Sequence, residues 1–252
     1  MSEETEAKKP IFENEGFCPA CAQQVKFEAY NSWYRDHYRC TSCGSIPRER
    51  ALMDTLESYF PNWRDLVIHE SSPISRGGSL RLSTECKEYL SSQYFPNNQP
   101  GEMVNGVRCE NLEKLTFEDE SIDIHISQDV LEHVFDPAAV FKEIARTLKP
   151  GGAHIFTTPI VNKQNPSKLR ARLKPDQTVE YLAEPEYHGN PVSADGSLVT
   201  VHWGYDICQY IFDACGLFTQ LIIMDDISKG IRAEYIDVLF TWKSKGSLEI
   251  LA

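Results

Sequence analysis

The stretch LTFEDESIDIHISQDVLEHV, Leu115–Val134, decides the fold of this chain. Within it, Ile122–Ile126 alternates apolar and polar side chains, which is the pattern of a β-strand. Asp136 and Pro137 then supply an N-cap and a first-turn proline, and apolar residues recur behind them at helical spacing. A second strand-like segment follows at His154–Thr158. A strand, a helix and a strand in this order predict two parallel neighbours in one sheet.

The same alternation continues on both sides of that unit. Further strands are expected at residues 66–69, 88–91, 106–109, 219–224 and 235–242, and further helices at 46–60 and 205–215. Strands that alternate with helices predict an α/β fold, with a mostly parallel sheet and helices on both of its faces. In such folds, ligands bind at the carboxyl ends of the strands.

Four of the eight cysteines form two C-x-x-C pairs, which eighteen residues separate. They are Cys18, Cys21, Cys40 and Cys43. Two such pairs can place four thiolates at the corners of a tetrahedron, which suits zinc. A redox-active dithiol is the alternative, but two matched pairs argue against it. A site closed by four cysteines predicts a structural metal whose binding folds a small ribbon.

The segment around these cysteines is rich in aromatic side chains that lie among basic ones. The aromatic residues are Phe27, Tyr30, Trp33, Tyr34 and Tyr38. Aromatic rings among cations can form a platform for nucleic acid. They can also be the packing core of a small module, which is the commoner role and the one we favour.

The composition favours a small-molecule partner. The chain carries 37 acidic and 25 basic side chains, a formal net charge of -12, which repels a phosphate backbone and disfavours nucleic acid. No apolar run approaches the roughly 18 residues of a membrane span, and the first residues do not resemble a signal peptide. We therefore expect a cytoplasmic protein without a membrane partner. The sequence carries no signal for its oligomeric state.

These patterns divide the chain into a disordered tail over residues 1–16, the zinc ribbon over 17–46 and the α/β domain over 47–252. The domain contains an irregular insertion around residues 159–201, which is too long for a plain connection. We expect this insertion to form a lid over the substrate. Arg170 and Arg172 within it could pair with an acidic group of the substrate, or they could be ordinary solvated charges.

The central stretch resembles the class I S-adenosylmethionine-dependent methyltransferases, whose sequences read L-P-F-x-D-x-S-F-D, then V-L-E-H-V, then R-x-L-K-P-G-G. The matching residues here are Leu115, Phe117, Asp119, Ser121, Asp123, Val130–Val134, Arg146 and Leu148–Gly152. The resemblance covers the chain from about residue 60 to its end. It implies a Rossmann-like, seven-stranded sheet with S-adenosylmethionine bound across the strand ends.

The cofactor loop departs from the pattern of this family. Relatives carry (D/E)-x-G-x-G after the first strand, whereas this chain has HESSP at residues 69–73, with two glycines further along. The ribose-binding acid after the second strand is also replaced, and Asn111 falls where relatives have an adenine-contacting Asp. We expect Glu70 or the serines to take over the polar contacts. The expected cofactor-binding residues are His69, Glu70, Ser71, Gly77, Gly78, Ser92, Gln93, Glu110, Asn111, Leu112, Ser127 and Gln128.

A hydroxyl or amine acceptor must lose a proton, which requires a base with a pKa near neutrality. The candidate catalytic residues are His133, His188 and His202, because histidine titrates in this range; a structural role is the alternative for each. In addition, Asp129, Glu132 and His133 resemble the E-x-x-E-H motif of small-RNA 2′-O-methyltransferases and ubiquinone-pathway O-methyltransferases. That resemblance implies a second, divalent metal beside the substrate, although no fourth ligand is evident.

Our leading interpretation is a small-molecule methyltransferase that acts on oxygen or nitrogen by in-line transfer. Two alternatives stay open. One is an RNA methyltransferase, because ribbon-plus-methyltransferase arrangements also occur among ribosomal RNA modifiers. The other is a non-catalytic protein that binds the cofactor or acts as a scaffold.

Overall fold

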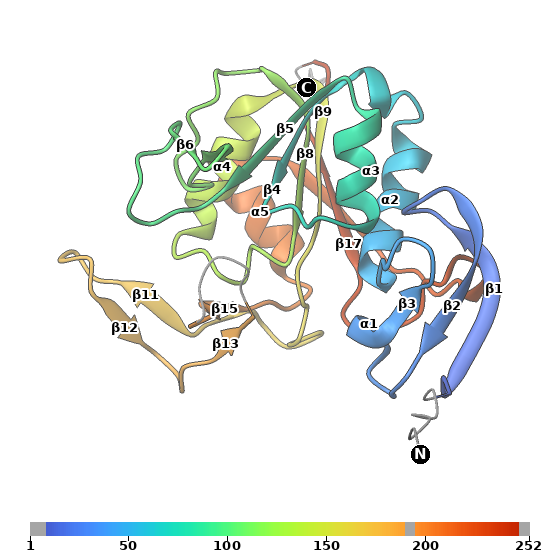
Figure 1. Ribbon diagram of the computed structural model, residues 1–252. Coiled ribbons are helices and arrows are strands. Elements are labelled where there is room, and N and C mark those ends of the chain that lie inside the picture. Colours follow the sequence, from blue (N-terminus) through green and yellow to red (C-terminus); the bar gives the residue numbers. More distant parts are fainter. Residues whose placement is uncertain (1–8, 190–194, 247–252) are drawn as a thin grey trace, which may run out of the picture.

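The computed structural model describes residues 9–189 and 195–246. It contains a small antiparallel sheet near the N-terminus and a large mixed sheet with helices on both faces (Figure 1). A third part, an arm of short hairpins, extends away from the carboxyl ends of the large sheet (Figure 1). The strand tips therefore lie between the ribbon on one side and the arm on the other.

The ribbon is built from three antiparallel strands and one turn of helix. These are β1 (Phe12–Cys18), β2 (Gln23–Ala29), α1 (Tyr34–His37) and β3 (Tyr38–Cys40). The expected disordered tail over residues 1–16 is wrong for its last part, because β1 begins at Phe12 and pairs along its whole length with β2. Residues 1–8 of that tail lie outside the described residues. The side chains of β1 alternate in exposure, but its sequence FENEGFC is too polar to reveal a strand.

The large sheet has the strand order β16-β17-β9-β8-β4-β5-β7-β6. Its strands are β4 (Val67–Ser71), β5 (Glu88–Gln93), β6 (Met103–Val104), β7 (Val107–Cys109), β8 (Ile122–Gln128), β9 (Leu148–Thr157), β16 (Phe218–Ile222) and β17 (Val238–Trp242). The five central strands β9, β8, β4, β5 and β7 run parallel, and the others join antiparallel. The Rossmann-like α/β prediction is therefore confirmed. The sheet has eight strands instead of seven because β6 folds back on β7 at its edge.

Two helices cover each face of this sheet (Figure 1). They are α2 (Pro47–Tyr59) and α3 (Gly77–Glu85) on one face, and α4 (Pro137–Thr147) and α5 (Ile207–Cys215) on the other. One apolar cluster joins α2, β4 and the ribbon, so the ribbon shares a core with the large domain. A second cluster joins α4, α5 and the opposite sheet face. Two single turns of 3-10 helix complete the set, at Trp63–Asp65 and Ile227–Lys229.

The insertion around residues 159–201 is not irregular throughout, because it forms paired short strands. These are β10 (Lys168–Leu169) with β15 (Val201–His202), β11 (Ala171–Leu173) with β12 (Val179–Tyr181), and β13 (Tyr187–His188) with β14 (Ser197–Leu198). None of the described helices is both long enough and apolar enough to cross a bilayer.

Candidate functional site

The carboxyl ends of the central strands lie level along one edge of the sheet. Ser71 at the end of β4 pairs with both Ser92 and Ser127, and Gln128 at the end of β8 pairs with Thr157. The loops that follow these strands therefore meet at one place. This edge is where open α/β sheets bind their ligands.

Two of the expected cofactor residues, His69 on β4 and Ser92 on β5, point into the core instead. His69 and Ser92 are buried, and the imidazole Nε2 of His69 lies 2.8 Å from the hydroxyl of Ser92. The other ring nitrogen of His69 lies 2.9 Å from Nδ1 of His125 on β8. Because both side chains are bonded within the sheet, we do not propose them as cofactor contacts.

Glu70 is also buried, but it lies next to the crevice. Its carboxylate accepts hydrogen bonds from the hydroxyls of Ser79 at 2.5 Å and Tyr89 at 2.7 Å. Burial raises the pKa of Glu70, and these hydrogen bonds oppose that shift. The amide nitrogen of Gln128 lies 3.5 Å away, while its amide oxygen is buried without a hydrogen-bond partner in the described chain. Gln128 is thus the side chain at this edge that still has an acceptor to offer a ligand.

The remaining expected cofactor residues fall into two groups. Those at the strand ends are Ser71, Gln93, Glu110, Asn111, Leu112 and Ser127. Among them Glu110 is held by Arg108 at 2.6 Å, and the Asn111 side-chain oxygen accepts from the backbone of Glu113 at 2.9 Å. That bond leaves the amide nitrogen of Asn111 to donate to a ligand, rather than the oxygen that the sequence led us to expect.

Gly77 and Gly78 belong to the second group, because they start α3 and pack against α2. A Cβ atom on Gly78 would lie 2.7 Å from Cγ of Met53, and one on Gly77 would lie 2.6 Å from Glu49 Oε2. Gly77 also has a φ of +52°, which favours glycine. In this structure both glycines therefore permit the close approach of two helices.

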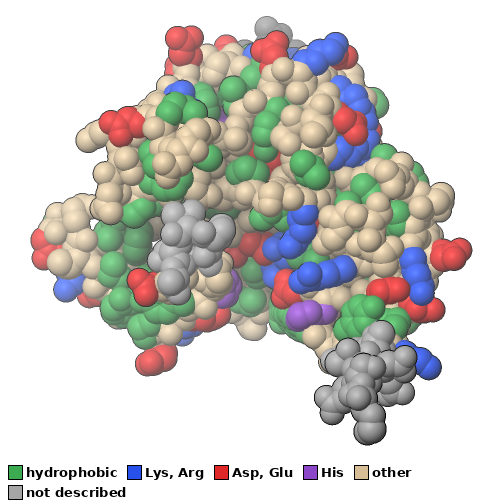
Figure 2. Space-filling view, in the orientation of Figure 1, with side chains coloured by type: hydrophobic (Ala, Val, Ile, Leu, Met, Phe, Trp, Pro, Cys, Tyr) green, Lys and Arg blue, Asp and Glu red, His purple; other side chains and the backbone are tan. Residues whose placement is uncertain are grey.

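Asp129, directly after β8, is bound by the ribbon. Nη2 of Arg35 donates to its Oδ2 at 2.5 Å, and Nε of Arg48 lies 3.0 Å from the same oxygen. Burial opposes ionisation of Asp129, but Arg48 and Arg35 outweigh it and hold its pKa low. Basic side chains gather next to acidic ones where the ribbon meets the large domain (Figure 2). Asp129 is thus an ionised, fully engaged side chain.

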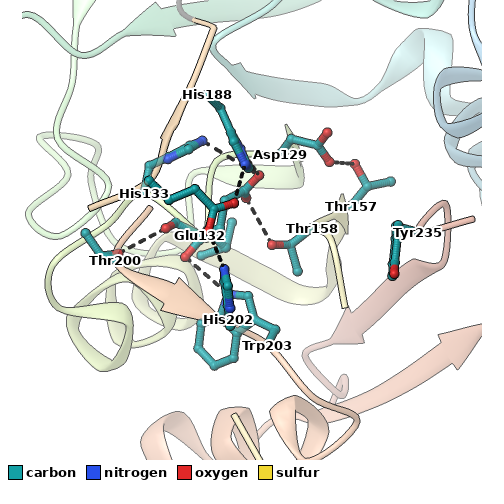
Figure 3. A network of polar contacts seen from close by, with 12 residues as sticks. Asp129, Glu132, His133, Thr157, Thr158, His188, Thr200, His202, Trp203 and Tyr235 are labelled. Carbon is teal, nitrogen blue, oxygen red and sulfur yellow. Dashed lines mark hydrogen bonds and ion pairs between the residues drawn. The ribbon is translucent and has the colours of Figure 1, made fainter. Parts of the chain in front are cut away.

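Glu132 lies at the centre of a cluster of imidazoles (Figure 3). Its Oε1 is 3.7 Å from Nε2 of His133 and 3.9 Å from Nδ1 of His188. His202 joins through Glu186, which lies 2.9 Å from Nε2 of His202 and 3.4 Å from Nε2 of His188. The structure therefore brings all three predicted catalytic histidines to one place, and it adds Glu186. No pattern in the sequence singled out Glu186, because an acid in a polar loop looks like a solvated charge.

The protonation of this cluster follows from its contacts. Burial and repulsion by Asp129 raise the pKa of Glu132 to about 8. Its Oε2 accepts from the hydroxyl of Thr158 at 3.0 Å, while Oε1 has no hydrogen-bond partner among the residues that the structure describes. Nδ1 of His133 faces the carbonyl of Leu198 at 2.9 Å, so this nitrogen carries the proton. The free lone pair of His133 therefore sits on Nε2, which faces Glu132.

The same side chains form a candidate metal set. One ligand atom each from Glu132, His133 and His188 lie within 4.8 Å of one another. A carboxylate and two imidazoles suit Mn, Fe or Zn. The expected set of Asp129, Glu132 and His133 is wrong in one member, because both arginines occupy Asp129. His188, which comes from the arm, takes that place.

The arm is anchored directly on this cluster. Backbone N–H and hydroxyl of Thr200 both donate to the carbonyl of Glu132, at 2.7 Å and 3.1 Å. Arg170 lies 3.4 Å from Glu186, so it faces the site. Arg172 pairs at 2.5 Å with Glu180 on the outer hairpin, so it is a surface charge. The arm thus contacts the cluster through His188 of β13 and His202 of β15, and its role as a lid stays a prediction; residues 190–194 lie outside the described residues.

The four cysteines of the two C-x-x-C pairs converge in the ribbon. All four sulfurs lie within 4.8 Å of one another, with 3.8 Å between Cys18 and Cys43 and 4.0 Å between Cys21 and Cys40. Tetrahedral zinc with bonds of about 2.3 Å requires sulfurs about 3.8 Å apart. The residues therefore fit a zinc ion. The described cysteines form no disulfide.

The ribbon aromatics mostly pack together. Phe27 and Tyr38 are fully buried, and the rings of Phe12, Tyr34 and Tyr38 stack or meet edge to face within 6 Å. Tyr30 and Trp33 stay exposed. The packing interpretation is thus correct for three of the five rings, and two isolated rings do not make a continuous stacking surface.

One known protein family matches the part of the chain that includes the ends of β5, β7 and β8. Residues 80–156 match the family model described as "Methyltransferase domain". This part of the chain is therefore similar to methyltransferase domains. The match begins in α3 and ends within β9, so it contains Gln128, Asp129 and the Glu132–His133 pair.

Curated relatives match the same region. A ubiquinone biosynthesis O-methyltransferase of Parvibaculum lavamentivorans is 30% identical over 88 residues, which is 35% of either chain. The enzyme of the same name from Coxiella burnetii is 27% identical over 88 residues, 35% of this chain and 38% of that one. A dimethylglycine N-methyltransferase of Parasynechococcus marenigrum is 42% identical over 50 residues, 20% of this chain and 18% of the relative. The chain spans about a third of the length of the first two relatives and a fifth of the third.

Solved structures are similar over a longer part. An S-adenosylmethionine-dependent methyltransferase from Mesorhizobium loti has 16% identity and a TM-score of 0.47, over 77% of this chain and 98% of that one. A didemethyltoxoflavin N1-methyltransferase from Burkholderia thailandensis, solved with S-adenosylhomocysteine, has 12% identity and a TM-score of 0.45, over 78% of each chain.

Proposed function

We propose that this protein is an S-adenosylmethionine-dependent methyltransferase that acts on an oxygen or nitrogen of a small molecule. The methyltransferase domain match and the level strand tips support a cofactor at this edge. The observation that carries the proposal is the Glu132 cluster beside those tips, because it supplies a proton acceptor there.

Residues at the strand ends would hold the cofactor. The unpartnered oxygen of Gln128 and the free amide nitrogen of Asn111 support contacts to its two ends, with Gln93 between them. When bound, the cofactor supplies an electrophilic methyl group on a sulfonium. The protein must then align the acceptor atom with that methyl group and exclude water. The arm, anchored through Thr200, would close the site from one side.

Removal of the acceptor proton falls to the Glu132 cluster. With a pKa of about 8, the carboxyl group of Glu132 exchanges a proton near neutral pH. Nε2 of His133, 3.7 Å away, can receive that proton, since Nδ1 is committed to the Leu198 carbonyl. His188 and Glu186 extend the pathway toward the arm. The three histidines proposed from the sequence thus act through one buried acid.

A divalent cation is a second way to use the same residues. The buried Oε1 of Glu132 without a hydrogen-bond partner in the described chain favours it, since a cation would compensate that charge. Glu132, His133 and His188 would be the ligands, and the cation would lower the pKa of a bound hydroxyl. We also propose that Cys18, Cys21, Cys40 and Cys43 hold a structural zinc ion, for which their spacing is suitable.

Calorimetry with S-adenosylmethionine and S-adenosylhomocysteine tests this proposal. We expect both to bind, and we expect Gln128→Ala to weaken both. No measurable binding of either would favour the scaffold interpretation. The RNA alternative has little support, because the net charge is -12 and the exposed ribbon aromatics form no continuous stacking surface. RNA affinity that falls steeply with salt would restore it.

A further inference from the structure

A cavity of about 370 Å³ lies between the ribbon and the segment that joins β16 to β17. The ribbon contributes Trp33, Tyr34 and Arg35, and the large domain contributes Met224, Ile236 and Asp237, among others. Two parts of the chain that are almost 200 residues apart thus form one binding-sized space. The methyltransferase domain match at residues 80–156 includes none of these residues.

Arg35 connects this cavity to the strand tips. Its Nε donates to the carbonyl of Tyr235 at 3.3 Å, while Nη2 binds Asp129. Both of these partners have left-handed backbones, with φ of 52° at Asp129 and 56° at Tyr235. Non-glycine residues persist in that conformation where the surroundings hold them, and such residues cluster at functional sites. Tyr235 lies across from Asp129 and the Glu132 cluster, beyond Thr157 and Thr158 (Figure 3). One residue of the cavity lining, Arg35, therefore contacts the side chain that directly follows β8.

Among the charges that line this cavity, one carboxylate has no direct partner in the described chain, and only the more distant Lys163 stabilises its charge. Arg35 is engaged by Asp129, and Arg232 pairs with Asp225 at 2.5 Å. Glu234 lies 3.8 Å from Lys163. Asp237 is partly buried and has no hydrogen bond or ion pair within the part of the chain that the structure describes. An anionic ligand would find no free arginine here, whereas a cationic one would find Asp237.

Aromatic rings complete the environment of that carboxylate. The indole of Trp33 is 44% exposed, although its N–H is bonded to Asp36 at 2.7 Å, so its ring face is available. The Trp33 and Tyr235 rings lie 6.3 Å apart. The Tyr235 ring already has the ammonium of Lys163 at 5.3 Å. A carboxylate and an exposed indole ring that line the same cavity form an environment that recognises ammonium groups.

We propose that this cavity binds an ammonium or quaternary ammonium group of the methyl acceptor, with Asp237 as its counter-ion and Trp33 as its aromatic wall. Arg35 acts as a positioning residue that fixes the cavity against the strand tips. The zinc ribbon is therefore part of the acceptor site. This inference rests on the proposed function and specifies the chemical class of its acceptor.

The test titrates the full chain, saturated with S-adenosylhomocysteine, with tetramethylammonium chloride. Sodium chloride at equal ionic strength is the blank, and trimethylacetate and tert-butyl alcohol are the anionic and neutral probes of similar shape. Binding is read from the indole N–H signal of Trp33 in NMR spectra, assigned with Trp33→Phe. We expect saturable shifts with tetramethylammonium alone. Asp237→Asn should weaken binding by about fivefold, the loss of a partly exposed ion pair. Trp33→Leu should weaken it by about fivefold as well, through loss of the cation–π contact, and because this variant lacks the indole reporter it is compared with wild type by calorimetry.

The control variant is Asp213→Asn, an exposed acid on α5 whose removal should leave the titration unchanged. Circular dichroism verifies that each variant is folded. If trimethylacetate binds as well as tetramethylammonium, or if Asp237→Asn binds it equally well, the inference is wrong. Because S-adenosylhomocysteine binding is measured first, failure of the proposed function would appear as a missing calorimetric signal, before any acceptor probe is added.

Discussion

Arg35 in the ribbon and Asp129 directly after β8 form an ion pair of 2.5 Å, and both side chains are mostly shielded from solvent. The two residues are 94 positions apart. Asp129 directly follows β8 and lies three residues before Glu132. The Arg35 side chain of the ribbon therefore contacts the segment that carries the proposed reaction centre. The folding of the ribbon and the geometry of the strand tip are thereby linked.

Arg35→Ala should lower the free energy of unfolding by about 2 kcal/mol, because it leaves a buried carboxylate with Arg48 as its one cationic partner beside the hydroxyl of Thr157, among the described residues. Arg35→Lys should recover part of that loss, and Arg35→Ala combined with Asp129→Asn should lose less than the two changes added together. Urea denaturation gives these values. The control is Arg232→Ala, which breaks an exposed pair and should change stability by about 0.5 kcal/mol or less. Simple additivity in the double variant would contradict the direct coupling.

The large sheet was predictable because each of its central strands has a local signal. Ile122–Ile126 alternates within β8, and Asp136 caps α4 by accepting from Ala139, as its sequence indicated. α3 was missed because its first two residues are glycines, which suggested a loop. Their use depends on the approach of α2, which only the tertiary structure reveals.

The sequence indicated which residue types form the candidate site, but not which of these side chains contact one another. The three histidines were identified from their chemistry, and the arm does bring His188 to Glu132. The sequence could not reveal that Asp129 faces the ribbon, because the placement of two separately patterned segments depends on a shared core. Nor could the sequence reveal that His69 and Ser92 are both buried and bonded to each other between β4 and β5.

Glu132 should control the pH dependence of methyl transfer. Since its pKa is raised to about 8, kcat/KM should increase as pH rises toward 8, where the carboxylate becomes available as the base. Glu132→Gln should remove this limb and reduce kcat by roughly a hundredfold. The control is Glu118→Gln, an exposed acid. An unchanged pH profile in Glu132→Gln would assign the proton transfer elsewhere.

The same shift makes a prediction about stability. An acid whose pKa is higher in the folded state binds more protons there than in the unfolded state. Its contribution to the free energy of unfolding therefore falls as the pH rises from the pKa of the unfolded state to about 8. Wild-type protein should therefore lose stability relative to Glu132→Gln from pH 5 to pH 8. Chemical denaturation at several pH values measures this difference. Bound divalent cation would cancel it, so the series is run with and without a chelator.

The ribbon should hold one zinc ion per chain. Elemental analysis should give that ratio for wild-type protein and for Cys208→Ser, whose cysteine lies on α5, and a near-complete loss for Cys40→Ser. Because the ribbon shares a core with the large domain, metal loss should lower the melting temperature of the whole chain by roughly 10 °C. A full complement of zinc in Cys40→Ser would show that the metal lies elsewhere.

The three buried histidines His69, His125 and His154 should make the fold sensitive to acid. They occupy paired positions on β4, β8 and β9. Burial lowers the pKa of His69 and His154 to about 3, and it lowers that of His125 well below its usual value. Unfolded histidines take up protons near pH 6.5 while these do not, so stability is complete above that pH and falls below it. Each contributes about 1.4 kcal/mol per pH unit once the unfolded form is protonated.

His154→Gln removes one of these groups, and its amide can keep the bond to Ser127 that the imidazole makes at 3.0 Å. The slope of unfolding free energy against pH, measured by urea denaturation between pH 6 and 4, should therefore fall by about a third of the histidine contribution. His37→Gln, which changes an exposed histidine, should leave the slope as it is. If both variants give the wild-type slope, the three buried imidazoles do not cause the loss of stability in acid. Buried carboxylates such as Glu70 would then have to cause it.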